Sequence, residues 1–290
     1  MKKRSGKRMF IRIGILIIIG MITVFFNIPF SKTRSEFNLT VANLTAKPDH
    51  VEGVFREEDI AGLPKPVQKY FRYCGHIGKP QMSYIKIVYK DVDFSFGKNK
   101  PPIKIDYTQY NFVDKPDRIA YIDSSIYTIP FEGLDSYIDG NGSMKGRIAK
   151  LFTLFHQTGP TMDKSSLVTF LAESLFVPSA ALQDYIVWEP IDDLHAKATI
   201  SYYGISASGI FTFSESGEIL SFTTEDREVI ATNGTSEKAK WSVVCKEYKE
   251  INGIKKPTVF QAIWSYDDGD LVYFDGKGII TEYIKPASCR

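Results

Sequence analysis

Two short segments carry nucleophile-like motifs, but neither has the partners that nucleophilic catalysis needs. The GISAS segment from Gly204 to Ser208 resembles a nucleophile elbow only until its fifth residue, which should be glycine, and its surroundings predict strands instead of a strand-to-helix turn. Ser95 and Lys98 have Ser-x-x-Lys spacing, yet they lie in an alternating strand pattern and no Lys-Thr-Gly segment follows. We therefore assign no catalytic residue from the sequence.

The acidic residues and the potential metal ligands also lack the spacing that a catalytic or metal site needs. Adjacent acids such as Asp192 and Asp193 would point to opposite faces of a strand, which favours solvated surface charge over a general acid–base pair. The sequence contains no complete EF-hand loop, GxGxxG segment or Walker segment, and we expect no metal and no cofactor. HExxH and HxxxH spacings are missing among the four histidines, which are His50, His76, His156 and His195.

The three cysteines, Cys74, Cys245 and Cys289, lie far apart in the sequence. This spacing fits neither a CxxC metal pattern nor a dense disulfide framework. At most one bridge could form, so at least one thiol stays free. Small buried thiols are the simpler interpretation.

Aromatic residues are the first feature with functional potential. The chain contains 16 Tyr, 20 Phe and 3 Trp, which make up 13% of its residues. Aromatic rings with one polar group suit the wall of an apolar ligand cavity. The alternative is that these rings simply fill the core, and the sequence leaves both interpretations open.

A second feature is the segment SMKGRIAKLFTLFH, which covers residues 143–156. Its apolar residues recur at helical spacing and predict an amphipathic helix. The basic residues beside them suit an anionic membrane surface, whereas packing of the apolar face on the sheet is the alternative. The apolar positions are Ile148, Leu151, Phe152 and Phe155, and the basic positions are Lys145, Arg147 and Lys150.

The N-terminal segment from Met9 to Phe30 is apolar and reaches about the 20 residues that a helix needs to cross a bilayer. A cleaved signal peptide would have a shorter apolar core and a cleavage site of small residues, but the first alanine is Ala42. Six basic residues precede or enter this span, and only Lys32 and Arg34 follow it closely. The positive-inside rule therefore predicts a single-pass anchor in the cell membrane, with a cytoplasmic N-terminus and an extracytoplasmic C-terminal domain.

Polarity and residue periodicity divide the chain into three parts. We expect residues 1–30 to form the cytoplasmic basic stub and transmembrane anchor, residues 31–60 a polar tether, and residues 61–290 a single extracytoplasmic β-rich domain. Apart from the six basic residues at the N-terminus, the chain has 30 basic and 34 acidic residues. A mildly acidic body lacks the clustered positive face that phosphate binding needs, so we expect no nucleic-acid partner.

Periodicity within the body predicts helices and many short strands. An amphipathic helix covers LPKPVQKYFRYCG, and the second of two central helices is capped at Asp163. In the clearest strand, residues 258–266, we expect the face of Phe260, Ala262, Trp264 and Tyr266 to be buried. Other strands are expected at 84–96, 103–112, 118–127, 136–139, around 188, and at 196–203, 210–213, 219–224, 240–247, 271–274 and 279–284. Hairpin turns are expected at 216–217, 252–253, 268–269 and 275–276.

Three blocks of this body resemble signature blocks of a bacterial family of domains of unknown function. They read LPKPVQKYFRYCGHIGKP from Leu63, LAESLFVPSAAL from Leu171 and VWEPIDDLHAKATI from Val187. The resemblance covers most of the chain from Leu63 to Ile284 and implies a bacterial envelope protein without assigning a reaction. The closing meander is also similar in style to lipoprotein-carrier half-barrels, in which a curved antiparallel sheet wraps helices around an apolar cavity.

The resemblance also marks the candidate ligand contacts. Tyr121 stands where the family has a tryptophan, so the resemblance carries no indole to this position. Glu173 falls away from the apolar face of its helix by the 3.6-residue period, and we expect it in solvent. Trp188 and Trp241 fit either core anchors or ligand contacts. The candidate ligand-binding residues are Tyr121, Glu173, Trp188, Arg227 and Trp241.

We therefore expect an α+β fold, mainly antiparallel β, in which an N-terminal transmembrane helix precedes a curved antiparallel sheet or half-barrel with two or three helices. The leading functional hypothesis is a membrane-anchored extracytoplasmic module that binds a hydrophobic or lipid-like ligand. The alternatives are an envelope structural or interaction protein with a filled core, and a hydrolase-like enzyme. A cavity would favour the first hypothesis, and a cleft with converging titratable groups would favour the enzyme.

Overall fold

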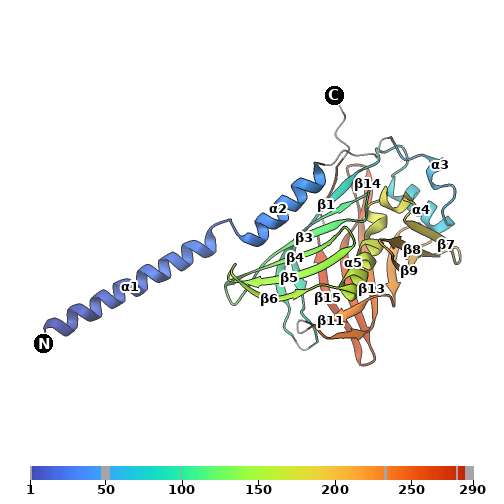
Figure 1. The fold of residues 1–290 in the computed structure, drawn as a ribbon. Helices are drawn as coiled ribbons and strands as arrows, with labels where there is room; N and C mark the ends of the chain where they lie inside the picture. Colours follow the sequence, from blue (N-terminus) through green and yellow to red (C-terminus); the bar gives the residue numbers. More distant parts are fainter. Residues whose placement is uncertain (1, 47–52, 99, 232–233, 279, 285–290) are drawn as a thin grey trace.

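The N-terminal helix leaves the rest of the molecule at one side, as Figure 1 shows. The structure is a computed structural model that describes residues 2–46, 53–98, 100–231, 234–278 and 280–284. Helix α1 (Lys2–Asn27) is long and apolar enough, by length and composition, to cross a membrane. The described side chains along its apolar stretch face outward and touch little of the body.

One open antiparallel sheet makes up most of the body in the described part of the chain. Its two terminal strands, β6 and β7, do not pair with each other, so the sheet is not closed into a barrel. The predicted mainly antiparallel fold is confirmed. The strand order is β6 (Phe152–Gln157), β5 (Asn141–Ile148), β4 (Ile129–Ile138), β3 (Arg118–Ile126), β2 (Ile103–Phe112), β1 (Tyr84–Phe94), β15 (Gly269–Lys277), β14 (Ile254–Tyr266), β13 (Lys240–Ile251), β10 (Ile219–Thr224), β9 (Ile205–Phe213), β8 (His195–Tyr202) and β7 (Ile186–Pro190), and β16 (Ile280–Ile284) also pairs with β1.

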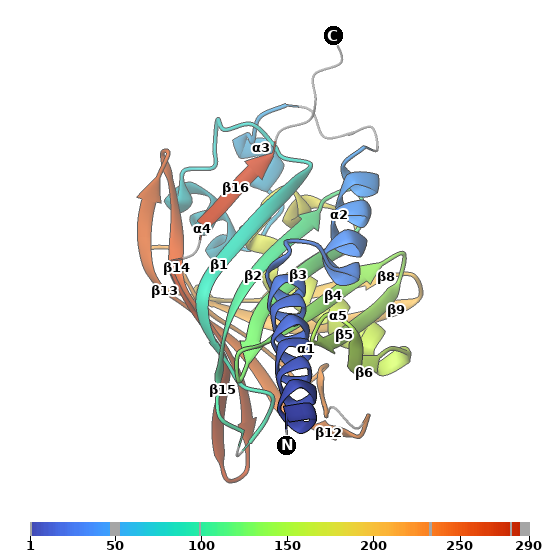
Figure 2. The same ribbon diagram turned by 90° about the vertical axis from the view of Figure 1, so that its left-hand side faces the viewer.

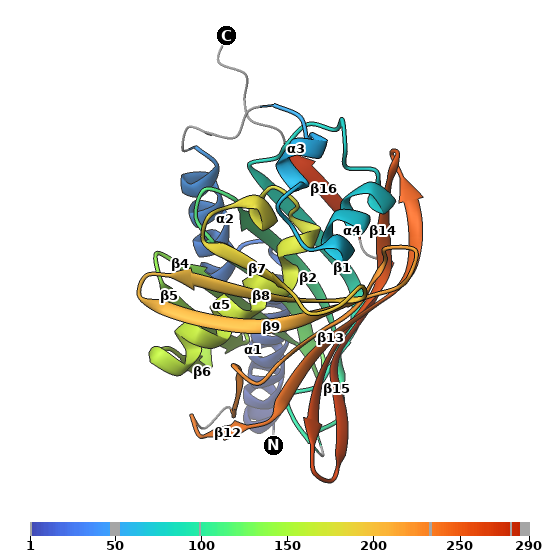
Figure 3. The same cartoon turned by 90° about the vertical axis from the view of Figure 1, so that its right-hand side faces the viewer.

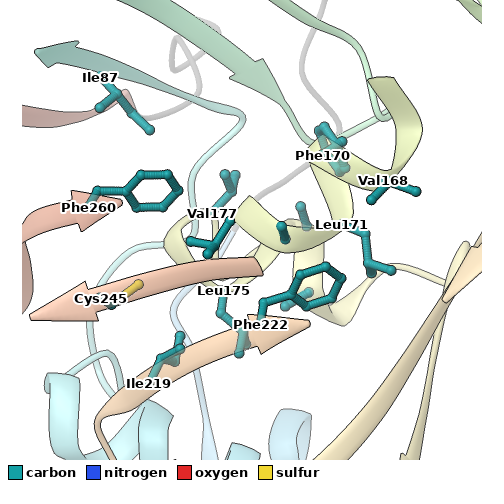
Figure 4. Close-up of a cluster of buried hydrophobic side chains, with 14 of the residues drawn as sticks. Ile87, Val168, Phe170, Leu171, Leu175, Val177, Ile219, Phe222, Cys245 and Phe260 are labelled. Atoms are coloured by element: carbon teal, nitrogen blue, oxygen red, sulfur yellow. The ribbon is translucent and has the colours of Figure 1, made fainter. Parts of the chain in front are cut away.

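The sheet curves around one long helix, α5 (Pro160–Glu173), which contacts β4 and β5 on one side and β8 and β9 on the other (Figure 3). The apolar side chains of α5 and of the sheet's concave face form the main core, part of which Figure 4 shows. Phe260, Ala262 and Trp264 are buried in this core, as the alternation along their strand predicted. Tyr266, at the end of the same face, is only partly buried and packs against the core. Two short 3₁₀ helices, η1 (Ser174–Phe176) and η2 (Ala180–Leu182), follow α5.

The predicted helix over LPKPVQKYFRYCG is α4 (Lys65–Cys74), with Pro66 in its first turn and Gly75 in the left-handed conformation (φ 77°) after its end. Its buried face packs at the top of the sheet, next to the short helix α3 (Glu57–Ile60) (Figure 1). A small separate hairpin, β11 (Glu228–Ile230) with β12 (Ser236–Lys238), lies at the opposite end of the body (Figure 3).

The convex face of the sheet carries a helix that the sequence pattern missed. Ser31 caps α2 (Lys32–Thr45), because its Oγ accepts a hydrogen bond from the Arg34 backbone N–H at 3.0 Å. Figure 2 shows α2 lying along the outer side of β3. Phe37 is buried there against Tyr121 and Leu134. The predicted polar tether is therefore wrong for this part of residues 31–60, because one narrow apolar stripe is enough to fix α2 on the sheet.

The amphipathic helix predicted for residues 143–156 is also wrong. This segment forms β5, a turn and β6, and the turn is made by Ala149 (φ 53°) and Lys150 (φ 61°). The apolar residues of this segment are three and four positions apart only because a turn lies between the two strands that carry them. Their match to a helical period is therefore a coincidence. The turn predicted at 275–276 lies instead within β15, where a side chain at Gly276 would come within 2.9 Å of the Tyr89 ring.

Candidate ligand-binding cavity

A cavity of about 210 Å³ lies between the concave face of the sheet and α5. Its walls are mainly aromatic: Tyr89 of β1 meets Phe274 of β15 edge to face, with ring centroids 5.2 Å apart. Trp264 stacks on Tyr273 with ring centroids 6.0 Å apart, and the Trp241 ring centroid lies 6.4 Å from that of Trp264. Rings in these arrangements make a rigid apolar wall. The aromatic surplus of the sequence is thus divided between the core and this cavity.

The floor of the cavity is polar and is built around one buried arginine. Arg118 of β3 is 1% exposed, and its Nη1 donates to Asp135 Oδ2 at 2.9 Å. Its Nη2 donates to the Tyr107 hydroxyl at 3.0 Å. A buried guanidinium needs such partners, because an isolated buried charge is strongly unfavourable. Burial lowers the pKa of Arg118, but the neighbouring carboxyl groups of Asp135 and Glu173 oppose this, and the net pKa of Arg118 lies above its ordinary value.

Glu173, at the end of α5, completes the floor. Its Oε2 accepts hydrogen bonds from Gln109 Nε2 at 2.6 Å and from Asn111 Nδ2 at 2.8 Å. Arg118 Nε lies 3.8 Å from the same oxygen, which is an ion pair but too long for a hydrogen bond. Burial raises the pKa of Glu173 above its ordinary value, although Arg118 and the two amides oppose the shift.

The prediction that Glu173 lies in solvent is wrong, since only 5% of it is exposed. The helical period correctly predicts that Glu173 lies outside the apolar face of α5. However, the sheet curves around α5, so the second face is also covered. The sequence signal for the floor was in β2, where Tyr107, Gln109 and Asn111 alternate toward the inside of the sheet.

Several buried polar atoms around the cavity lack an intramolecular hydrogen-bond partner. They include Arg118 Nε and the hydroxyls of Ser165 and Ser166 on α5. The two serines are 3% and 2% exposed and line the cavity. Buried polar groups are usually hydrogen-bonded, so these atoms are available to a polar group of a bound molecule or to water.

Arg227 and the aromatic rings around it lie at the end of the cavity near β11. Arg227 lies over the Trp241 ring at 4.2 Å and over the Trp264 ring at 5.4 Å, and its Nη1 donates to the Tyr273 hydroxyl at 3.2 Å. Trp241 Nε1 donates to the same hydroxyl at 3.0 Å. This arrangement holds the Arg227 guanidinium against aromatic rings of the cavity wall.

The structure thus brings together three of the five candidate residues: Glu173, Arg227 and Trp241 all line the cavity. Tyr121 does not, because Ala120 and Ile122 point into the core and place Tyr121 on the convex face, where its hydroxyl donates to Glu132 at 2.8 Å.

Trp188 also lies away from the cavity. Its Nε1 donates to the Ala181 carbonyl at 2.9 Å, and its ring packs on Phe211 at 5.3 Å. It is a packing residue at the β7 end of the sheet.

The remaining sequence candidates add no second site. In the described ranges no three His, Cys, Asp or Glu side chains come together as metal ligands. Cys74 and Cys245 are free and buried. His50 and Cys289 lie outside the described residues.

Comparison with known proteins places the chain in a family. Residues 53–276 match the model of the family of unknown function DUF6544, and the chain belongs to this family. The resemblance inferred from the sequence blocks is confirmed. No curated protein matches the chain.

Among solved structures, the chain is similar to a LolA superfamily protein from Nitrosomonas europaea, with 10% identity, a TM-score of 0.38, and coverage of 77% of this chain and 94% of that chain. It is also similar to a DUF1329 family protein from Desulfovibrio piger, with 13% identity, a TM-score of 0.33, and coverage of 76% and 93%. At these TM-scores the similarity is partial.

Proposed function

We propose that this protein binds a hydrophobic or amphipathic small molecule, such as a lipid, in the cavity between the curved sheet and α5. The observation that carries the proposal is the cavity itself. Its walls are aromatic, and a few buried polar groups gather at its floor, which is the usual composition of a small-molecule site. A structural protein with a filled core has no need of such a space.

The chemistry of the lining defines the ligand further. The rings of Tyr89, Trp264 and Phe274 favour an apolar chain or ring system. The hydroxyls of Ser165 and Ser166 favour a hydrogen-bonding group at the inner end of the ligand. We therefore propose a ligand with an apolar body and a small polar end.

The proposal includes the location of the protein. The apolar length of α1 and the basic residues around its start support a single-pass anchor, with the N-terminus in the cytoplasm and the cavity domain outside it. An anchored domain of this kind would take its ligand from the envelope.

Native mass spectrometry of the full-length protein, extracted from membranes in mild detergent, tests the binding proposal. We expect a co-purified small molecule in the wild type, and its loss in Met144→Trp, because the larger ring would fill the cavity from β5. Val187→Trp is the matched control, because Val187 is 58% exposed on β7. The proposal fails if the wild type carries no ligand and takes up no fluorescent fatty acid, or if both variants bind equally.

The converging titratable groups favour a hydrolase-like enzyme as a second candidate. A buried carboxyl with a raised pKa, such as Glu173, is suited to act as a general acid. The same mass spectra distinguish the two candidates. An enzyme would return a chemically altered ligand, and Glu173→Gln would return it unaltered.

A further inference from the structure

Two hairpin tips expose apolar side chains on the side of the body where α1 leaves. Tyr127, in the turn between β3 and β4, is 89% exposed. Leu151 and Phe152, at the tip between β5 and β6, are 64% and 66% exposed. Exposed apolar side chains are ordinary one at a time, but a cluster of them indicates a contact surface. We call the set of Tyr127, Ile129, Leu151, Phe152 and Leu154 the tip patch.

The two tips form one continuous edge. The backbone N–H of Ala149 donates to the Pro130 carbonyl at 2.7 Å, and Phe131 pairs with Ile148 in the sheet register. The β3–β4 turn is therefore held beside the β5–β6 turn. Figure 1 shows these strands ending next to the junction of α1 and α2.

Direct contacts connect this edge to the end of α1. Lys150 Nζ donates to the Ile28 carbonyl at 2.6 Å and to the Phe25 carbonyl at 3.4 Å. Lys150 directly precedes Leu151 and Phe152, so the tip patch lies at the height of the last turn of α1. Aromatic residues and lysines are the side chains typically found at the interface between membrane and water.

The residue types in the two turns are unusual for their backbone conformation. Tyr127 and Thr128 have φ values of 49° and 66°, and Ala149 and Lys150 have φ values of 53° and 61°. Two-residue turns of this kind favour Asn and Gly, because other residues are strained at positive φ. The backbone of these turns does not itself favour a tyrosine or a lysine. The Tyr127 side chain is exposed, and the Lys150 side chain contacts the end of α1.

We infer that the tip patch rests in the headgroup region of the bilayer that α1 crosses, so that the membrane lipid surface is its partner. This inference rests on the proposed anchoring of α1. It also places the cavity next to the bilayer, because β6 is the edge strand of the sheet and exposes Leu154 (53%) while Phe155 (9%) lines the cavity. A ligand can then pass between bilayer and cavity along this edge.

Lipid quenching of an added tryptophan tests the contact in the full-length protein. Phe152→Trp and the control Val187→Trp are reconstituted in vesicles of phosphatidylcholine and phosphatidylglycerol, with or without bromine on the acyl chains. After the wild-type signal is subtracted, we expect bromine to quench the added emission of F152W and to leave that of V187W unchanged. Equal quenching of the two variants, or none in F152W, would overturn the inference.

Two further measurements separate this inference from the proposals beneath it. Wild-type protein that does not float with the vesicles would refute the anchor and the inference with it. The variant F152S/L154S should still float and still bind a fluorescent fatty acid in detergent, but it should exchange that ligand with vesicles more slowly than the wild type. Unchanged exchange in a variant that binds normally would refute the proposed route between bilayer and cavity.

Discussion

Replacing Arg118 by methionine should remove the cation that holds the floor of the cavity together. Methionine keeps much of the apolar length of the side chain, so the change is mainly one of charge. In the wild type, Arg118 contacts Asp135 at 2.9 Å and lies 3.8 Å from Glu173. Both carboxyl groups would remain in the fold without a positive partner.

The expected loss of unfolding free energy is about 3 to 5 kcal/mol, which is typical when one member of a buried ion pair is removed. The loss should depend on pH. Burial already raises the pKa of Glu173, and removing Arg118 removes the charge that opposes this shift. A carboxyl whose pKa is higher in the folded state destabilises the fold as pH rises above its unfolded value. The deficit of R118M should therefore be larger at pH 8 than at pH 5.

Urea unfolding of the full-length protein in non-ionic detergent, followed by tryptophan fluorescence, measures this loss. The control is Lys104→Met, because Lys104 pairs with Asp93 at 3.0 Å on the surface, and such pairs contribute less than about 1 kcal/mol. The double variant R118M/E173Q should be more stable than R118M at pH 8, because one unpaired charge is gone. A deficit like that of K104M, or one independent of pH, would refute the account of the floor.

Three further predictions concern other parts of the fold. His76 is buried among aromatic rings, and burial together with the charge of Lys256 lowers its pKa to about 4. In this pH range the unfolded chain therefore binds a proton that the folded protein does not. Between pH 6.5 and 4, urea titrations should show the wild type losing about 3 kcal/mol of unfolding free energy relative to His76→Phe. Parallel pH profiles of the two proteins would contradict this. Gly142→Ala should lower stability by about 1 to 3 kcal/mol, because its Cβ would lie 2.4 Å from the Met162 carbonyl oxygen on α5, whereas Gly62→Ala should have little effect because nothing lies within 4 Å. Cys74 and Cys245 should react with iodoacetamide only after unfolding, as peptide mass spectrometry would show, and labelling in the native state would place these thiols at the surface.

The strands could be predicted because one face of the sheet is buried and imposes a period of two on the sequence. The burial of Phe260, Ala262 and Trp264 follows from this pattern alone. Residues 143–156 show where the method fails. A tight turn of Ala149 and Lys150 contains neither Gly nor Asn, so nothing in the sequence interrupts the apparent helical period.

The site could be predicted only in part. Trp241 and Arg227 were selected from the family resemblance, and both line the cavity. The environment of Glu173 could not be inferred, because its partners Gln109 and Asn111 lie more than 60 positions earlier in the chain and reach it only when the sheet curves around α5. Alternation along β3 would have placed Tyr121 on the convex face once the inward positions of its neighbours were known.

The three tryptophans of the chain can test directly whether the cavity holds an apolar molecule. Trp241 and Trp264 line the cavity, and Trp188 does not. A brominated fatty acid is titrated into full-length Trp188→Phe, which keeps the two cavity tryptophans, and into W241F/W264F, which keeps only Trp188, with the unbrominated acid as control. We predict saturable quenching in Trp188→Phe and none in W241F/W264F. Equal quenching in the two proteins, or no saturable quenching in Trp188→Phe, would contradict the claim.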